Sequence, residues 1–136
     1  LEDPSLIPKA IEEMLRASLV GGLGIPRYAR DDIDIAGVTI PAGDLVLLDP
    51  GSANHDPAAF PDPDAVDFNR QGVPHVSFGY GGRYCMGAPL ARIELNSVFS
   101  QMIPRFPNMR LAVDPDDLAI NTEALGAGLV ELPVVW

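Results

Sequence analysis

The chain has 136 residues, of which 47% are hydrophobic and 21% are charged, so its length and composition suit a single folded domain. Its formal net charge of −10 argues against general nucleic-acid binding, because no basic stripe is available to neutralise phosphates. The only cysteine, Cys85, excludes an internal disulfide, a CxxC redox pair and a cysteine-only zinc or iron–sulfur site. No apolar run approaches the roughly 18 residues needed to span a bilayer. With residue 1 taken as the true N-terminus, we expect a cytoplasmic protein with no signal peptide and no membrane contact.

Helix-start residues open the chain at Asp3-Pro4-Ser5, and apolar residues then recur at helical spacing from residue 7 to about residue 19. Three glycines and a proline between residues 21 and 26 are expected to end this helix. The predicted helix is apolar on more than one side, which indicates packing partners that the remaining sequence hardly supplies.

Short extended segments follow at residues 27–30, 33–35, 38–40 and 44–49. The glycines and prolines between them predict a small antiparallel meander. Residues 50–77 contain five prolines and many acidic residues, which predicts a long coil pinned by prolines. Loops of this length inside a domain are usually functional.

Residues 89–105 form the strongest predicted helix, with a wide apolar face, and Pro104 and Pro107 are expected to end it. The tail alternates turns with short strands predicted at residues 110–113, 118–120 and 129–135. Neither an internal repeat nor a separate linker is present. The elements together predict a mixed α/β fold that is mainly α with small antiparallel sheets.

The stretch at residues 78–87 reads Phe-Gly-Tyr-Gly-Gly-Arg-Tyr-Cys-Met-Gly and carries Cys85 to the start of the helix predicted at 89–105. A helix N-terminus favours an anion, and Arg83 adds a positive charge close to the sulfur, so this loop favours a thiolate. Its glycines allow close approach of the backbone, and Phe78 can cover the loop. A thiolate is either a nucleophile or a metal ligand.

Two further interpretations of Cys85 are open from the residues alone. A lone cysteine in an apolar loop is often a small buried hydrophobe. A nucleophilic cysteine would need a histidine base, but His55 and His75 are the only histidines and neither lies in a recognisable cysteine-hydrolase context.

The fixed positions Phe-x-x-Gly-x-Arg-x-Cys-x-Gly resemble the haem-binding loop of the cytochrome P450 family at every position. The resemblance implies that Cys85 is the proximal ligand of the iron of haem b, to which the thiolate donates electron density. It implies that the backbone N–H groups of residues 86–88 point at the sulfur, and that three cationic side chains pair with the haem propionates. The implied haem-binding residues are Arg27, His75, Phe78, Gly79, Arg83, Cys85 and Gly87, of which Arg27, His75 and Arg83 are the propionate partners.

The segment Glu13-Met14-Leu15-Arg16 places an acid and an arginine three residues apart, which by itself is most often a surface ion pair. Its order and distance relative to the cysteine loop resemble the family's Glu-x-x-Arg helix, whose pair joins an arginine from the segment before the loop. Arg70 occupies that position here. The resemblance therefore implies a buried network of Glu13, Arg16 and Arg70. It also implies substrate-pocket positions at Ile25 and Leu125.

The resemblance covers nearly the whole chain but only about the C-terminal third of such an enzyme. We therefore expect residues 1–136 to be the C-terminal haem-binding part of one larger domain, interior to a longer protein and inactive alone. With its N-terminal part, the protein is expected to be a bacterial-type monooxygenase that hydroxylates or epoxidises a small organic substrate. Electrons would come from a ferredoxin or a flavoprotein, which is expected to dock on Arg83, Arg92 and Arg105. One alternative is a thiolate-haem protein without oxygenase activity: a sensor, an electron carrier or a peroxide-using protein. A second alternative is a haem-free interaction module, which the completeness of the cysteine loop disfavours.

Overall fold

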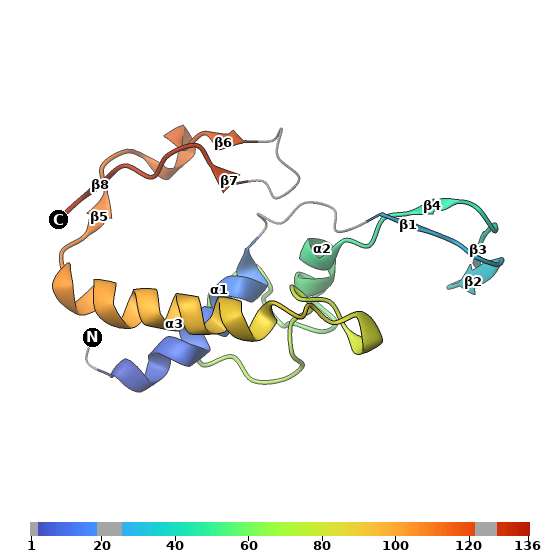
Figure 1. Cartoon of the computed structure of the whole chain (residues 1–136), viewed down its shortest axis with the longest axis horizontal. Coiled ribbons are helices and arrows are strands. Elements are labelled where there is room, and N and C mark those ends of the chain that lie inside the picture. Colours follow the sequence, from blue (N-terminus) through green and yellow to red (C-terminus); the bar gives the residue numbers. More distant parts are fainter. Residues whose placement is uncertain (1–2, 19–25, 122–127) are drawn as a thin grey trace.

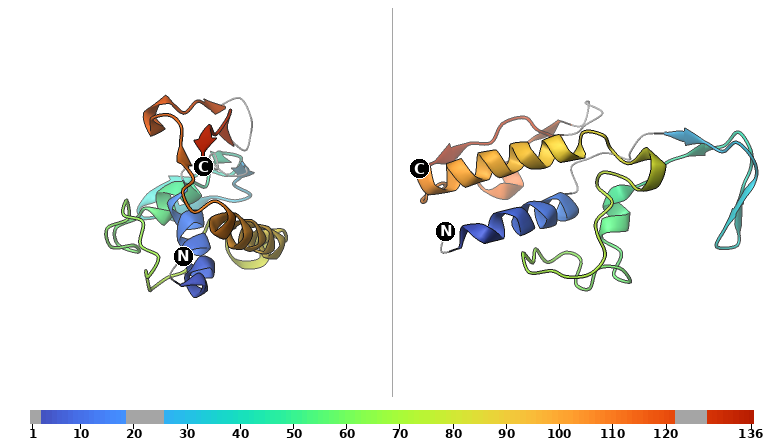
Figure 2. Two further views of the ribbon diagram at one scale, coloured as in Figure 1. Left: turned by 90° about the vertical axis from the view of Figure 1, so that its left-hand side faces the viewer. Right: turned by 60° about the horizontal axis from the view of Figure 1, so that its bottom comes forward.

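The computed structural model describes residues 3–18, 26–121 and 128–136. Two helices, α1 (Ile7–Ala17) and α3 (Ala88–Arg105), lie side by side, and the short α2 (Pro50–Asn54) contacts α1 (Figures 1 and 2). Within the described residues, the strands form four two-stranded antiparallel sheets. The prediction of a mainly helical fold with small antiparallel sheets is thus confirmed.

The helix α1 follows the 3₁₀ turn η1 (Pro4–Leu6), whose start is capped by Asp3. The Asp3 carboxylate accepts a hydrogen bond from the Ser5 N–H at 2.9 Å, as expected for a helix-start residue. One face of α1 is buried and carries Ile7, Ile11, Glu13 and Arg16. Two of those four residues are charged, so this face is both a packing surface and the base of a polar network.

The segment predicted as a meander is a pair of nested hairpins. The outer pair joins β1 (Arg27–Tyr28) to β4 (Leu45–Val46), and the inner pair joins β2 (Ile33–Ile35) to β3 (Val38–Ile40). The tight turn between β2 and β3 has positive φ at Ala36 and Gly37 (50° and 83°). Positive φ at both turn residues matches the strand twist that two-residue hairpins require.

The prediction of an uninterrupted coil at residues 50–77 is wrong at its start, where α2 forms. Asp49 caps this helix by accepting the N–H of Ser52 at 3.1 Å, and Pro50 occupies the first turn, where its missing N–H is not needed. Residues 55–77 contain only turns and bends.

The helix α3 begins one residue before its predicted start and ends at Arg105 as predicted, with Pro104 inside its last turn. After α3, β5 (Arg110–Leu111) pairs with β8 (Val134–Val135), and β6 (Ile120–Asn121) pairs with β7 (Gly128–Leu129). The 3₁₀ turn η3 (Pro115–Asp117) connects β5 to β6. These strands are shorter than predicted, but lie within or next to the predicted segments.

The apolar core of the described part is small: the buried hydrophobic residues are Ile7, Ile11, Ala29, Phe60 and Ala88. The chain exposes 10215 Å² of surface. A compact monomer of its mass, 14.5 kDa, would expose about 6,900 Å². The fold is therefore open for its size. Among the described helices, none combines the length and the apolar character needed to cross a lipid bilayer.

Candidate functional site

Cys85 lies on a loop that is closed by its own backbone, next to the N-terminal end of α3. The Cys85 N–H donates to the Phe78 carbonyl at 2.9 Å, and the 3₁₀ turn η2 (Gly81–Arg83) lies between them. Gly79 and Gly81 have φ of 75° and 69°, a left-handed conformation that favours glycine. The loop thus depends on two of its glycines for backbone shape.

The Cys85 thiol is exposed. Gly87 has an ordinary helical φ of −81°, so it is not needed for backbone shape. A Cβ at Gly87 would instead lie 3.7 Å from the sulfur, so its absence leaves open space beside the thiol. The Ala88 N–H donates to the Cys85 carbonyl at 3.2 Å, which corrects the prediction that it points at the sulfur. Within the described residues, the thiol is therefore not packed as a buried hydrophobic side chain.

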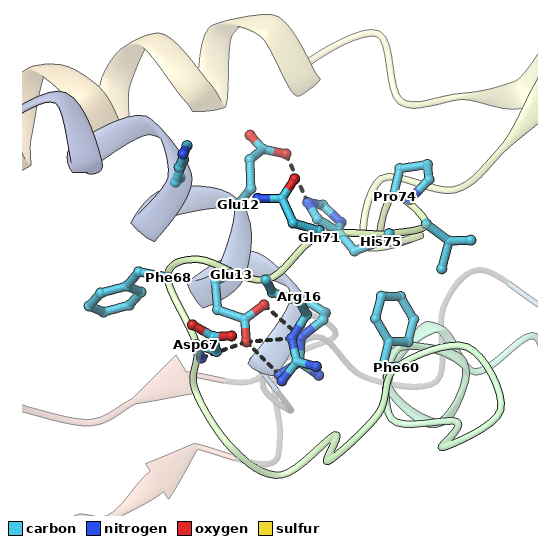
Figure 3. A pocket seen from close by; sticks show the side chains of 13 residues that line it. Glu12, Glu13, Arg16, Phe60, Asp67, Phe68, Gln71, Pro74 and His75 are labelled. Carbon is cyan, nitrogen blue, oxygen red and sulfur yellow. Dashed lines mark hydrogen bonds and ion pairs between the residues drawn. The ribbon is translucent and has the colours of Figure 1, made fainter.

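The predicted network of Glu13, Arg16 and Arg70 is present. Arg16 donates two hydrogen bonds to the Glu13 carboxylate, from Nε at 2.8 Å and from Nη2 at 2.9 Å, and Arg70 Nε donates to the same carboxylate at 3.0 Å. The Asp67 N–H adds a bond at 3.0 Å. Figure 3 shows the side chains of Glu13 and Arg16, both on α1, pointing toward each other. Glu13 and Arg16 are almost completely buried, so this is not a surface ion pair.

The two arginines also hold the coil that leads to the cysteine loop. Both donate to the Ala65 carbonyl, Arg16 at 3.1 Å and Arg70 at 2.8 Å. Arg70 further binds the carbonyls of Pro61 and Asp62. A coil without regular structure is therefore fixed to α1 by charge-assisted hydrogen bonds.

Burial disfavours the charged form of Glu13, but the hydrogen bonds from Arg16, the Asp67 N–H and Arg70 outweigh it. Together they lower the pKa of Glu13 from 4.5 to about 2. Glu13 is therefore ionised throughout the physiological range, and both arginines have a charged partner.

Asn54, which the sequence analysis overlooked, connects α2 to the segment before the cysteine loop. Its side chain is buried, its Oδ1 accepts the Val76 N–H at 2.8 Å, and its Nδ2 donates to Ser77 Oγ at 2.8 Å. Its backbone carbonyl accepts a bond from Arg16 Nη1 at 2.9 Å. The Asp49-Pro50 pair, which starts α2, is the signal that could have pointed to this helix and to Asn54 at its end.

A second charged cluster joins α1 to α3. Arg92 donates to both carboxylate oxygens of Glu12, from Nε at 2.6 Å and from Nη2 at 2.8 Å. Glu12 Oε2, which accepts from Arg92 Nη2, also contacts His75 Nε2 at 3.1 Å, and His75 Nδ1 accepts the Ser77 N–H at 3.2 Å. Burial lowers the pKa of His75 although Glu12 opposes this, so a neutral ring that donates from Nε2 fits the geometry.

This cluster changes the expectation for two predicted residues. Both ring nitrogens of His75 are used within the protein, so its propionate contact remains a prediction that would require one of these bonds to be exchanged. Arg92 is paired with Glu12 rather than free on a docking face, and α3 separates it from Arg105 by 13 residues, about 20 Å of helix. Docking of an electron donor on Arg83, Arg92 and Arg105 therefore remains a prediction, and it would require Arg92 to exchange its Glu12 contact.

Two further cations were predicted to bind the haem propionates, Arg83 and Arg27. Arg83 ends η2, two residues before Cys85, and its side chain makes no hydrogen bond or ion pair within the described part of the chain. Arg27 begins β1, and its Nη1 donates to the Pro26 carbonyl at 3.5 Å. The predicted pocket residues Ile25 and Leu125 lie outside the described residues.

These residues suit a haem. Cys85 supplies one exposed soft ligand, and the described residues contain no cluster of three His, Cys, Asp or Glu side chains that could compete for a metal. Exposed Tyr80 and Met86 give the loop an apolar outer face, and Arg83 offers a cation to a carboxylate. The loop therefore offers one thiol ligand next to exposed apolar side chains.

The comparisons with known proteins agree with this class of site. A family model described as Cytochrome P450 matches residues 2–131. The chain therefore belongs to the cytochrome P450 family.

Two curated relatives illustrate the similarity. The chain is 46% identical over 136 residues to the cytochrome P450 BJ-1 homolog of Sinorhizobium fredii, covering 98% of the chain and 34% of the relative. It is 44% identical over 137 residues to the mycinamicin IV hydroxylase/epoxidase of Micromonospora griseorubida, covering 100% of the chain and 34% of that protein. The chain thus spans about a third of the length of the curated relatives it matches.

Solved structures confirm the predicted fold family. The Streptomyces peucetius protein CYP105P2 superposes with a TM-score of 0.91 at 43% identity, over 99% of this chain and 34% of that one. Cytochrome P450 TxtC superposes with a TM-score of 0.93 at 44% identity, over 99% and 35%. The hairpins and helices described above are those of a portion of a P450.

Proposed function

We propose that residues 1–136 are the C-terminal haem-binding part of a longer haem-thiolate monooxygenase, with Cys85 as the proximal iron ligand. The observation that carries the proposal is the exposed Cys85 thiol on a closed loop, which hydrogen-bonded networks tie to α1, α2 and α3. A loop fixed on several sides presents one sulfur in one direction, as a metal ligand requires.

The cofactor of this proposal is haem b, which when bound would activate dioxygen for insertion of one oxygen atom into the substrate. Phe78, Gly79 and Gly87 would lie against the ring beside the Cys85 thiolate. Arg83, with no partner among the described residues, is the first candidate for a propionate, followed by Arg27 and His75.

A small organic substrate and a ferredoxin or flavoprotein electron donor complete the proposal. The relatives support it, because their names include a hydroxylase/epoxidase and an N-oxygenase. These names favour an oxygenase over a sensor or electron carrier. The hydroxylation or epoxidation of a particular molecule depends on a pocket that the described residues hardly form.

The open surface of the chain supports its place in a larger fold. Its 10215 Å² exceed the expectation for a compact monomer by about half. An apolar cavity of about 510 Å³ lies between α1 and α3 and is lined by Met14, Phe68, Phe99, Met102 and Ile103 among others. Packing against the remaining P450 residues would cover such surfaces, and the chain alone is expected to be inactive.

The test is the absorption spectrum of the reduced, CO-bound complete protein. Thiolate ligation gives a strongly red-shifted Soret band, and Cys85→Ser should abolish it. Gly82→Ala is the control, because a Cβ at Gly82 would meet nothing within 4 Å. A wild-type protein that lacks the band, or a Cys85→Ser protein that keeps it, would overturn the proposal.

A further inference from the structure

Among the described residues, Arg92 is the one side chain of α3 that hydrogen-bonds both to α1 and to the cysteine loop. Its Nε and Nη2 bind Glu12 of α1 at 2.6 and 2.8 Å, while Nη1 donates to the Tyr84 hydroxyl at 2.9 Å. All three of its nitrogens thus form hydrogen bonds. Glu12 is 80 residues away in the sequence and Tyr84 is eight residues away.

The guanidinium also covers Phe78, whose ring centroid is 4.9 Å from Arg92 Cζ. Phe78 and Tyr84 contact each other edge to face at 6.4 Å. These two residues bracket the thiol: Phe78 accepts the Cys85 N–H, and Tyr84 directly precedes Cys85. Arg92 therefore contacts the side chains of both residues whose backbone sets the position of Cys85.

The Glu12 side of the cluster extends this hold to the segment before the loop. Glu12 also binds His75, whose ring contacts Phe78 at 6.1 Å between centroids. Hydrogen bonding to Arg92 lowers the pKa of Glu12, with His75 contributing, so the carboxylate is charged where the two helices meet. The side chain of Arg92 is one-third exposed, so its bonds are partly shielded from water.

We propose that Arg92 is a positioning residue for the Cys85 thiol, acting through Tyr84 and Phe78 while anchored on Glu12. The proposal rests on the proposed role of Cys85 as an iron ligand. A role for Arg92 in docking an electron donor is the competing interpretation. Docking would require the guanidinium to exchange a two-bond carboxylate contact, a tyrosine bond and an aromatic contact for a partner's acid.

The experiment uses the complete haem-loaded protein and four variants. Arg92→Gln removes the charge, and Arg92→Lys keeps it but cannot bind Glu12 through two nitrogens and Tyr84 through a third. Tyr84→Phe removes only the hydroxyl contact. Arg105→Gln, an exposed arginine at the far end of α3, is the matched control. The readouts are the fraction of reduced, CO-bound protein without the red-shifted Soret band, the reduction potential of the haem that keeps it, and the rate of reduction by the donor.

With Arg92→Gln we expect about a three- to tenfold larger fraction without the band. Loss of hydrogen bonds to a partly exposed charged group changes an equilibrium by about this factor. The potential of the remaining thiolate-bound haem should also shift, since contacts around a ligand tune its metal. Tyr84→Phe should act in the same direction, Arg92→Lys should fall between Gln and wild type, and Arg105→Gln should keep the band and the potential of wild type.

Two results would overturn the proposal. One is a slower reduction by the donor with unchanged band and potential, which assigns Arg92 to docking. The other is lower haem retention with an unchanged potential in the haem that remains, which makes Arg92 merely structural. If Arg92→Gln does not fold, an unchanged potential in Tyr84→Phe decides against the proposal. A wild-type protein without the band refutes the proposed function instead.

Discussion

At the scale of single residues, Glu13 accepts three hydrogen bonds from arginines, two from Arg16 and one from Arg70. Replacing it by glutamine leaves the buried Arg16 guanidinium with no charged partner, which typically costs about 3–5 kcal/mol. Glu13→Gln should therefore retain little or no haem and have a lower denaturation midpoint than wild type. Glu94→Gln, an exposed glutamate on α3, is the control for loss of a negative charge. Normal haem content and an unchanged denaturation midpoint in Glu13→Gln would contradict the assignment of this network.

The low pKa of Glu13 also predicts a pH dependence. Its carboxylate stabilises the fold fully above pH 4.5, and this contribution is lost as the pH falls towards 2, because the unfolded state then binds the additional proton. The total is about 3 kcal/mol at about 1.4 kcal/mol per pKa unit. Denaturant midpoints of wild type and Glu13→Gln should therefore converge as the pH is lowered from 5 to about 3. A difference that stays constant over this range would show that the charge of Glu13 does not contribute.

Asn54 gives a prediction that the sequence alone did not suggest. Asn54→Ala leaves the Val76 N–H without its acceptor, so we expect a loss of about 1–3 kcal/mol in the free energy of unfolding. Asn69→Ala is the matched control, because Asn69 is exposed and its hydrogen bonds within the described residues use only its backbone. Equal denaturation midpoints for the two variants would argue against the role of Asn54.

The pairing of Glu13 with Arg16 could be predicted because the two residues are three apart on a helix, where local spacing brings them together. The role of Cys85 was inferred from its glycine-rich loop and stays a prediction. Glu12 and Arg92 are 80 residues apart, and neither stands in a distinctive local pattern. Their pairing depends on how α1 packs against α3, which no local spacing encodes.

At the scale of elements, the cysteine loop depends on glycine at some positions and not at others. Gly81 has a φ of 69°, whereas Gly82 is outside that region, and a Cβ at either would meet nothing within 4 Å. Gly81→Ala should therefore destabilise the loop by about 1–2 kcal/mol through backbone strain alone, while Gly82→Ala should be nearly neutral. Thermal unfolding of the two haem-loaded variants measures this, and equal midpoints would mean that the loop relaxes without strain.

The same scale shows which elements local sequence specifies. Both long helices were predicted to within about two residues, because caps, prolines and helical periodicity act locally. The nested pairing of β1 with β4 was not predicted, since strand partners depend on contacts between distant residues. The five-residue α2 was missed because it is too short for a periodic pattern, although Asp49 and Pro50 form a helix start.

At the scale of the whole molecule, α1 and α3 leave apolar surface exposed around their shared cavity. The chain produced alone should bind an apolar fluorescent dye and unfold without a sharp transition. The complete protein should bind no dye and should unfold in a sharp transition. A monomeric, cooperatively unfolding chain with no dye binding would contradict its proposed place in a larger domain.

The long sequence separations in the charged clusters have a consequence for the order of folding. The cysteine loop closes through bonds between residues at most seven apart, whereas its anchors join Glu13 to Arg70 over 57 residues and Glu12 to Arg92 over 80. Distant contacts form late, because chain entropy must be lost before they contribute. Newly made chains therefore pass through a stage in which the Cys85 thiol is exposed but not yet held, and at that stage it is open to oxidation or to a disulfide with a second chain.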